Sequence, residues 1–383
     1  MQNSDLSGHV FLKKLKEQGY DRTLHYNMLI DQLDQKARIK GIPLNGQFEL
    51  TPLCNFDCKM CYSHLSKDQM CNESLLTVDQ WKKIVDEAYS AGLMRVTLTG
   101  GECLTYPGFK ELYLYLHSYG CEIRVLTNGT LLDDSWIAFF RDHPPALIQI
   151  SLYGGNDDVY ERVTGRRMFS VVSANIHRVI DAGLPITLAV TPSKYMGKDI
   201  FDTIRTAHAF GIQYSMPTFL IDPKEETGRS GEDHEMDLDT YVEACKLKYE
   251  LDGKEPGSID AELLPSPGGP YHDCGLLGLD CGGGRSTFDI DWNGAMYICN
   301  YFRSVVCYPL TEGFLPSWNK LHQVAVSWNR VPECIECPYE PLCTRCEIRK
   351  SNFGKNGKQT PMLQCNQIKR LVQNGVYIIQ DHM

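Results

Sequence analysis

The sequence predicts an α/β fold, in which six βα units form a parallel sheet that curls into a partial (β/α)6 TIM-like barrel. From Gln47 onward, short apolar runs alternate with amphipathic stretches, which is the pattern of repeated βα units. After Pro256 the chain becomes rich in Gly, Pro and Cys and has few periodic runs, which indicates a second region of another kind. In parallel barrels the functional residues lie at the carboxyl ends of the strands, so a site is expected there.

The individual elements follow from apolar periodicity and from helix start and stop signals. A capping-box pattern from Thr77 to Gln80 predicts the start of the first barrel helix, and Gly92 predicts its end. Asp133 or Asp134 is expected to cap a later helix. Strands are expected at 48–51, 94–98, 122–126, 147–152, 186–190 and 212–218, and helices at about 109–120, 170–183, 200–209 and 238–249.

The chain divides into three predicted parts: an N-terminal leader segment at 1–46, the barrel at 47–250 and a cysteine-rich domain at 251–383. The leader is expected to form two short helices. Their inward-facing residues would be Val10, Leu12, Leu15, Leu29, Ile30 and Leu33.

Composition excludes several classes of protein. The 383 residues are 43% hydrophobic and 22% charged, which is the balance of a soluble globular protein. A net charge of −10 without any basic block gives no indication of a nucleic-acid partner. No signal peptide and no membrane-length apolar stretch is recognisable, so a cytoplasmic protein is expected. Sixteen cysteines in such a chain favour metal or cluster binding over disulfides.

Three cysteines follow the first predicted strand in a Cys-x3-Cys-x2-Cys spacing: Cys54, Cys58 and Cys61. Three thiolates on one tight loop suit three irons of a cuboidal 4Fe–4S cluster and leave the fourth iron open. The alternative is zinc, which usually takes four ligands in closely spaced pairs. The nearest further thiol, Cys71, fits no zinc pattern, so the iron–sulfur interpretation is favoured.

Polar residues also follow the next strands. Gly100, Gly101 and Glu102 come after the second strand, where glycines permit close backbone approach and a carboxylate can bind an amine. Asn128 follows the third strand, and Ser151 ends the fourth. Each also has an ordinary explanation, since Gly-Gly is common in turns and strands often end on a hydroxyl.

The cysteine loop, the aromatic Tyr62 directly after it, and Gly100–Glu102 together resemble the signature of the radical S-adenosylmethionine (radical SAM) superfamily. The resemblance implies a 4Fe–4S cluster on Cys54, Cys58 and Cys61 whose open iron binds SAM. It implies that Tyr62, Gly100, Gly101, Glu102, Asn128 and Ser151 line the SAM pocket. Thr164 stands where many relatives have an arginine near SAM, which Arg162 or Arg166 would replace.

The C-terminal cysteines resemble the SPASM extension of radical SAM enzymes, which binds two auxiliary 4Fe–4S clusters. The implied ligands are Cys274, Cys281, Cys299 and Cys346 for one cluster and Cys334, Cys337, Cys343 and Cys365 for the other. Two residues separate Cys343 from Cys346 where the relatives have three. A zinc ribbon is the alternative for the paired cysteines, but further cysteines at compatible spacing disfavour it. Cys121 and Cys245 are expected to be small buried hydrophobes, and Cys103 is given no role.

The resemblance implies reductive cleavage of SAM to a 5′-deoxyadenosyl radical and oxidative modification of a substrate. The expected cofactors are three 4Fe–4S clusters and SAM, and the expected electron donor is flavodoxin-like or ferredoxin-like. Maturation of a ribosomally made peptide or protein, for example by a thioether crosslink, is favoured. Sulfatase-maturing relatives carry an aspartate base directly after the cysteine matching Cys299, whereas this chain has Asn300, which cannot act as a carboxylate base. The sequence is also compatible with a small-molecule substrate or, without catalysis, with an iron–sulfur electron carrier.

Overall fold

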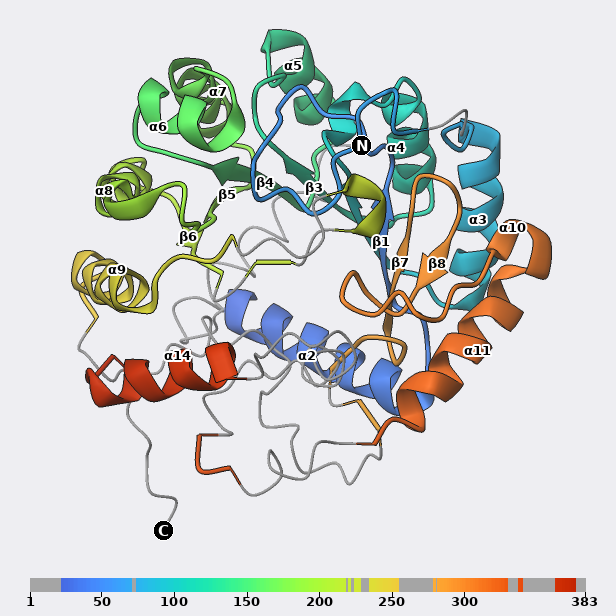
Figure 1. Ribbon diagram of the computed structural model, residues 1–383. Coiled ribbons are helices and arrows are strands. Elements are labelled where there is room, and N and C mark those ends of the chain that lie inside the picture. Colours follow the sequence, from blue (N-terminus) through green and yellow to red (C-terminus); the bar gives the residue numbers. More distant parts are fainter. Residues whose placement is uncertain are drawn as a thin grey trace, which may run out of the picture.

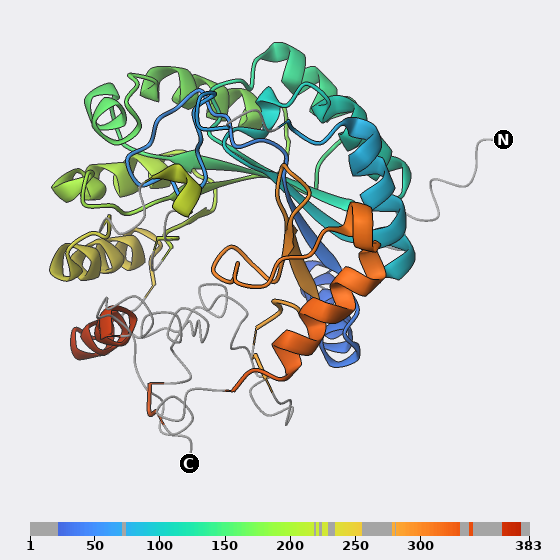
Figure 2. The same cartoon turned by 45° about the vertical axis from the view of Figure 1, so that its right-hand side comes forward.

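An eight-stranded sheet surrounded by helices forms the centre of the protein, as the computed structural model shows (Figures 1 and 2). The strand order is β6-β5-β4-β3-β2-β1-β7-β8, and every neighbouring pair is parallel except β7 and β8. The α/β partial barrel predicted from the sequence is therefore confirmed. The structure describes residues 22–70, 74–217, 220–221, 224–228, 234–254, 278–279, 281–329, 337–339 and 362–376.

The strands are short and mostly buried, as expected of a parallel sheet covered by helices. Their bounds are β1 Asn45–Glu49, β2 Arg95–Thr99, β3 Glu122–Thr127, β4 Leu147–Leu152, β5 Ile186–Val190, β6 Tyr214–Ser215, β7 Thr287–Ile290 and β8 Met296–Tyr297. The prediction for the sixth strand was too long, because among the described residues 212–217 only Tyr214 and Ser215 are paired with β5.

Helices cover the outer face of the sheet (Figure 1). Those within the barrel units are α3 Val78–Ala91, α4 Phe109–Ser118, α5 Asp134–Asp142, α6 Asp157–Thr164, α7 Phe169–Asp181, α8 Ile200–Ala209 and α9 Leu238–Leu251. The remaining described helices are α2 Arg22–Lys40, α10 Pro309–Glu312, α11 Phe314–Val326 and α14 Met362–Gln373, with short 3-10 turns at Cys103–Thr105, Gly197–Asp199 and Glu225–Thr227.

Local signals in the sequence position these helices. The predicted capping box is present, with Thr77 accepting a hydrogen bond from the Gln80 N–H and the Gln80 side chain accepting one from the Thr77 N–H. Asp133 caps α5 by accepting from the backbone N–H groups of Ser135 and Trp136. Gly92 ends α3, as predicted.

The leader differs from its prediction in one described part. A single helix, α2, runs through residues 22–40, and Leu29 on it is 54% exposed, so the expectation that Leu29 faces inward was wrong. The expected helix around Val10, Leu12 and Leu15 lies outside the described residues.

The segment after residue 281 joins the barrel sheet. β7 pairs in parallel with β1, in a register running from Asn45 opposite Thr287 to Phe48 opposite Ile290. Phe288 packs against Phe314 and Trp318 of α11, and Phe48 stacks on Trp81 of α3 with ring centroids 5.0 Å apart. The sheet is therefore continuous across the boundary predicted near residue 250.

None of the helices in the described ranges is both long enough and apolar enough to span a membrane.

Candidate functional site

The carboxyl ends of β1, β2 and β3 bring several of the predicted site residues together. The cysteine loop follows β1, Gly100–Glu102 follow β2 and Asn128 follows β3. The Asn128 Nδ2 atom lies 3.6 Å from the Cys54 sulfur, and the backbone N–H of Asn128 donates to Glu102 at 2.7 Å. Residues of three consecutive strand ends thus form one connected group.

The cysteine loop is held from outside by the end of α6. The backbone N–H of Asp57 donates to the Thr164 carbonyl at 3.1 Å, and that of Lys59 donates to the Val163 carbonyl at 3.0 Å. These carbonyls are left unpaired within the helix at its C-terminus, so the loop satisfies them. The sequence prediction did not include α6, although its capping Asn156 was visible.

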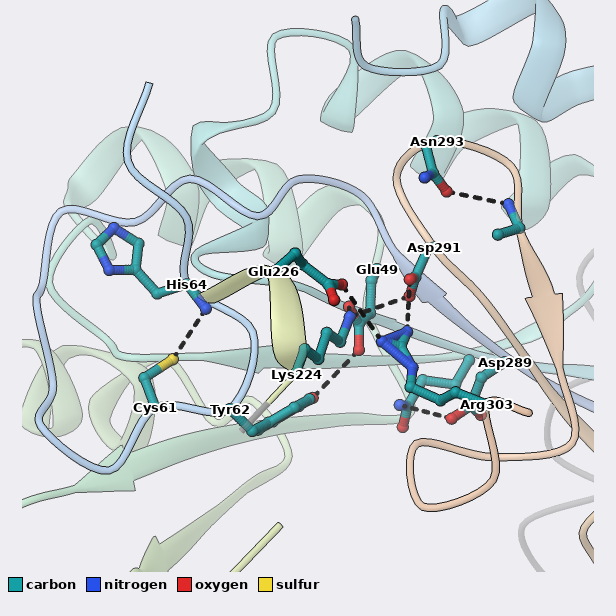
Figure 3. A network of polar contacts seen from close by, with 12 residues as sticks. Glu49, Cys61, Tyr62, His64, Lys224, Glu226, Asp289, Asp291, Asn293 and Arg303 are labelled. Atoms are coloured by element: carbon teal, nitrogen blue, oxygen red, sulfur yellow. Dashed lines mark hydrogen bonds and ion pairs between the residues drawn. The ribbon is translucent and has the colours of Figure 1, made fainter. Parts of the chain in front are cut away.

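Each thiol position in the loop is shaped by backbone donors and by its neighbours. The Cys54 sulfur accepts from the Phe56 N–H at 3.3 Å, and the Cys61 sulfur accepts from the His64 N–H at 3.2 Å (Figure 3). Burial raises the pKa of Cys54 to about 12, and Glu102 and Cys61 contribute to the rise. Burial also raises the pKa of Cys58, and the charges of Cys61 and Cys54 add to this. A bound metal would reverse this tendency, because a coordinating thiol is deprotonated.

The donor set fits a 4Fe–4S cluster better than a single zinc ion. Within the described ranges, no three His, Cys, Asp or Glu side chains converge closely enough to hold one metal ion. In a cuboidal cluster each thiolate ligates a different iron, so the sulfurs need not converge on one point. The cysteine loop offers three buried or half-buried thiols and backbone N–H groups that donate to two of them, which suits one thiolate for each of three irons.

Gly100 and Gly101 are required by a close backbone approach. The Gly101 N–H donates to the Thr51 carbonyl at 2.7 Å, and a Cβ on Gly100 would lie 2.4 Å from that same oxygen. A Cβ on Gly101 would lie 2.4 Å from the Leu53 carbonyl oxygen. Gly100 also has a φ of +142°, which L side chains rarely adopt. Because neither glycine has a Cβ, the backbone of the β2 loop can pack directly against the start of the cysteine loop.

Glu102 is 1% exposed and accepts three hydrogen bonds from N–H and hydroxyl groups. The donors are the Thr127 hydroxyl at 2.8 Å, the Asn128 N–H at 2.7 Å and the Leu104 N–H at 3.1 Å. Burial raises the pKa of Glu102, while these hydrogen bonds favour the ionised form and oppose that rise. Glu102 thus joins the β2 and β3 ends, in addition to its predicted role toward an amine.

Asn128 belongs to a chain of amide and hydroxyl groups that continues into the cysteine loop. Its Nδ2 donates to Asn55 Oδ1 at 2.7 Å, and Asn55 Nδ2 donates to the Thr130 hydroxyl at 2.7 Å. The Thr130 N–H donates to Asn128 Oδ1 at 3.0 Å. Asn55 was not singled out from the sequence, although it directly follows Cys54.

Ser151 lies in β4 beside a tyrosine that the sequence reasoning missed. The half-buried Tyr153 packs edge-on against Phe56 of the cysteine loop, with ring centroids 6.3 Å apart. The one feature of the sequence that could have indicated Tyr153 is its position directly after β4. Tyr62 donates through its hydroxyl to Glu49 Oε1 at 3.3 Å, so it points toward the end of β1 (Figure 3).

Arg162, Thr164 and Arg166 each make contacts within the protein. Arg162 donates from Nε to the Tyr195 carbonyl at 2.8 Å and forms an ion pair with Asp199, which ties α6 to the loop after β5. Thr164 donates to the Tyr160 carbonyl within its own helix. The N–H of Arg166 donates to the Thr164 hydroxyl at 3.3 Å.

Four of the eight predicted auxiliary ligands are described. Gly283 packs against Ile298. A Cβ added to this glycine would lie 3.0 Å from Ile298 Cγ2 and 3.5 Å from the Cys281 sulfur, so the chain near Cys281 runs beside the chain near Cys299. Cys337 and Cys365 are partly buried. The other four, Cys274, Cys334, Cys343 and Cys346, lie outside the described residues.

Similarity to known proteins extends over most of the chain. Residues 48–207 match the family described as the radical SAM superfamily. The sporulation killing factor maturation protein SkfB of Bacillus subtilis is 26% identical over 201 residues, covering 52% of this chain and 46% of SkfB. The antilisterial bacteriocin subtilosin biosynthesis protein AlbA, also of Bacillus subtilis, is 29% identical over 328 residues, covering 82% of this chain and 69% of AlbA. The chain thus spans less than half the length of SkfB.

The fold is shared with a solved structure, that of SuiB from Streptococcus suis bound to the precursor peptide SuiA. The TM-score is 0.62 at 15% identity, and the alignment covers 97% of this chain and 88% of SuiB.

Proposed function

Because residues 48–207 form a radical SAM domain, we propose that the protein is a radical SAM enzyme that oxidatively modifies a ribosomally made peptide or protein. The family implies a 4Fe–4S cluster and SAM, which when bound supply the radical chemistry. The observation that carries the proposal is the connection of the three-thiol loop, Gly100–Glu102 and Asn128 at one edge of the barrel.

The residues of the chain have distinct tasks in this proposal. Cys54, Cys58 and Cys61 hold the cluster that is reduced during turnover. Tyr62, Gly100–Glu102, Asn128 and Ser151 form the SAM pocket around it. The protein orients SAM and substrate and excludes water from a buried site.

A peptide or protein substrate is supported by the relatives. SkfB is named for the maturation of a sporulation killing factor, AlbA is named for the biosynthesis of the bacteriocin subtilosin, and SuiB was solved with a precursor peptide. Sulfatase-type oxidation is disfavoured by Asn300, which stands where those relatives carry an aspartate base. An external flavodoxin-like or ferredoxin-like protein would supply the electron.

The proposed function is tested with the anaerobically reconstituted protein, SAM, a reductant and the precursor peptide encoded by a neighbouring gene. Formation of 5′-deoxyadenosine together with a mass change of the peptide supports the proposal. Absence of 5′-deoxyadenosine under conditions that reduce the cluster rejects it and favours an electron carrier.

Three 4Fe–4S clusters predict about twelve irons per chain. Changing Cys54, Cys58 and Cys61 together to alanine is expected to lower iron to about eight per chain, because the first cluster loses all its protein ligands. Iron and sulfide analysis measures this. The control is Cys121→Ala, which alters a buried thiol outside the proposed ligands and should keep all the iron. Stoichiometric zinc with little iron would reject the cluster assignment.

The auxiliary clusters are expected to support turnover of substrate and not the cleavage of SAM. Cys281→Ala and Cys337→Ala should retain slow formation of 5′-deoxyadenosine but lose modified peptide. Circular dichroism must first show folded variants, since a cluster-dependent domain can unfold when a ligand is removed. Folded variants with full peptide modification would contradict this role. Loss of SAM cleavage with an intact first cluster would instead place an auxiliary cluster on the electron path.

A further inference from the structure

A buried group of charged side chains lies at the carboxyl ends of β1 and β7, next to Tyr62 of the predicted SAM pocket. Glu49 is the last residue of β1, Asp289 lies in β7, and Asp291 follows β7 directly. Successive strand residues point to opposite faces of a sheet. Phe48 and Phe288 pack against the outer helices, so Glu49 and Asp289 face the interior of the barrel.

Two of these three carboxylates are paired with cations (Figure 3). Lys224, whose side chain is 2% exposed, donates from Nζ to Glu49 at 2.6 Å and to Asp291 at 3.2 Å. Arg303 donates from Nη2 to Asp291 at 2.5 Å. These contacts satisfy the requirement that buried charges be paired and hydrogen-bonded.

Asp289 is the third carboxyl group, and its partner is weak. In the described part of the chain, the only hydrogen bond to its side chain comes from Gln47 Nε2 at 3.5 Å, the outer limit for such a bond. The residue is 9% exposed. Glu226 also lies 3.8 Å from Arg303, so four carboxyl groups share two described cations, Lys224 and Arg303. The buried Nε of Arg303 also has no acceptor among the described residues.

The surroundings of Asp289 keep it neutral in the free protein. Burial raises the pKa of Asp289 to about 8, and the charges of Glu49 and Asp291 contribute, against the opposing effects of Arg303 and Lys224. The described charged and titratable groups around it are Glu49 from β1, Tyr62 from the cysteine loop, Lys224 and Glu226 from the segment after β6, and Asp291, Tyr297 and Arg303 from the segment around β8.

We propose that Asp289 binds a cationic group of the substrate, a guanidinium or ammonium group such as an arginine or lysine side chain of a peptide. The cation would supply the counter-charge that Asp289 needs once its proton is lost, and a charge-assisted hydrogen bond would replace the weak contact with Gln47. A neutral donor supplies no positive charge and would leave Asp289 protonated. The group lies at the strand ends where parallel barrels bind substrate, one strand away from the cysteine loop. Only the identification of the cation as part of a peptide rests on the proposed function.

Binding of a cation ionises Asp289 and releases its proton. With a pKa of about 8, roughly one-tenth of Asp289 is ionised at pH 7 and roughly nine-tenths at pH 9. Since apparent affinity scales with the competent fraction, the affinity for a permanent cation should rise about tenfold from pH 7 to pH 9.

The test uses the reconstituted, SAM-loaded protein and n-butylguanidinium chloride, with n-butylurea as the neutral analogue. Infrared difference spectroscopy follows the carbonyl band of protonated Asp289, which Asp289→Asn must remove. At pH 7, butylguanidinium is expected to bleach this band in the unaltered protein and in the control Asp142→Asn, an exposed position on α5. Butylurea should leave the band unchanged. Equal bleaching by butylurea, or no bleaching by saturating butylguanidinium, overturns the proposal.

A second measurement uses the precursor peptide without turnover. Asp289→Asn should weaken peptide binding about ten- to a hundredfold. Replacing the recognised lysine or arginine by norleucine should weaken it equally, with no further loss in Asp289→Asn. If every lysine or arginine substitution in the peptide lowers affinity further in Asp289→Asn, as it does in the unaltered protein, Asp289 is not the group that binds the cation.

If the peptide is modified but Asp289→Asn binds it normally, this inference fails and the proposed function stands. If butylguanidinium binds but no 5′-deoxyadenosine forms, the proposed function fails and the cation site at Asp289 stands. If Asp289→Asn does not fold, the tenfold rise in butylguanidinium affinity from pH 7 to pH 9 in the unaltered protein still tests the proposal, and an affinity that does not change with pH overturns it.

Discussion

Replacing Lys224 by methionine is expected to lower the free energy of unfolding by about 3–5 kcal/mol, the usual effect of removing one partner of a buried ion pair. The change leaves Glu49 and Asp291 in the barrel interior with Arg303 as their main counter-charge. Burial lowers the pKa of Lys224, but Glu49 and Asp291 more than offset this, so the ammonium group is charged. Thermal unfolding of the reconstituted protein at a fixed scan rate measures the loss.

Two further variants decide whether buried charge is the cause. Lys246→Met removes an ion pair with Glu243 on the surface of α9 and should change stability by less than about 0.5 kcal/mol. Adding Glu49→Gln to Lys224→Met should recover part of the loss, because it removes one of the uncompensated carboxylates. Equal unfolding midpoints for Lys224→Met and Lys246→Met would show that the Lys224 pairs contribute little.

Glu102→Gln is expected to weaken SAM binding about ten- to a hundredfold, with iron content unchanged. Glutamine keeps the size and one acceptor oxygen, but its NH2 group opposes the N–H of Asn128, which now donates to Glu102 Oε2. The end of β3 would shift relative to the β2 loop, and the carboxylate proposed to meet the SAM amine would be lost. Equilibrium binding of SAM to the reconstituted protein measures the effect.

The matched control is Glu111→Gln on α4, where the carboxylate is exposed and pairs with Lys82. It should bind SAM as the unaltered protein does. Full SAM affinity in a folded Glu102→Gln variant would show that the carboxylate neither contacts SAM nor positions the pocket.

Local sequence signals predicted the parts of the fold that depend on neighbours in the chain. The apolar runs at 147–152 and 186–190 predicted β4 and β5 with their observed bounds, and the Thr77–Gln80 capping box predicted the start of α3. The strand-end position of Glu102 and Asn128 followed from the same signals, because parallel strands end at a common edge.

Long-range pairing could not be predicted from the same signals. β7 lies beside β1, and nothing in the four residues of β7 indicates a partner more than two hundred positions away. The contact of Lys224 with Glu49 and Asp291 could not be predicted either, because a single lysine in a charged loop is usually exposed. The three donors to Glu102 likewise come together only when the β2 and β3 loops are packed against each other.

The place of β7 in the sheet also has a consequence for synthesis of the chain. During translation, β1 emerges early and pairs with β2, but its other edge keeps unpaired N–H and C=O groups until residue 290 has left the ribosome. A contact so distant in sequence closes late in folding, since a long loop must first be ordered. The last parallel strand of the described sheet to be synthesised is thus the one that covers the open edge of the first, and it carries Asp289 into the barrel as it does so.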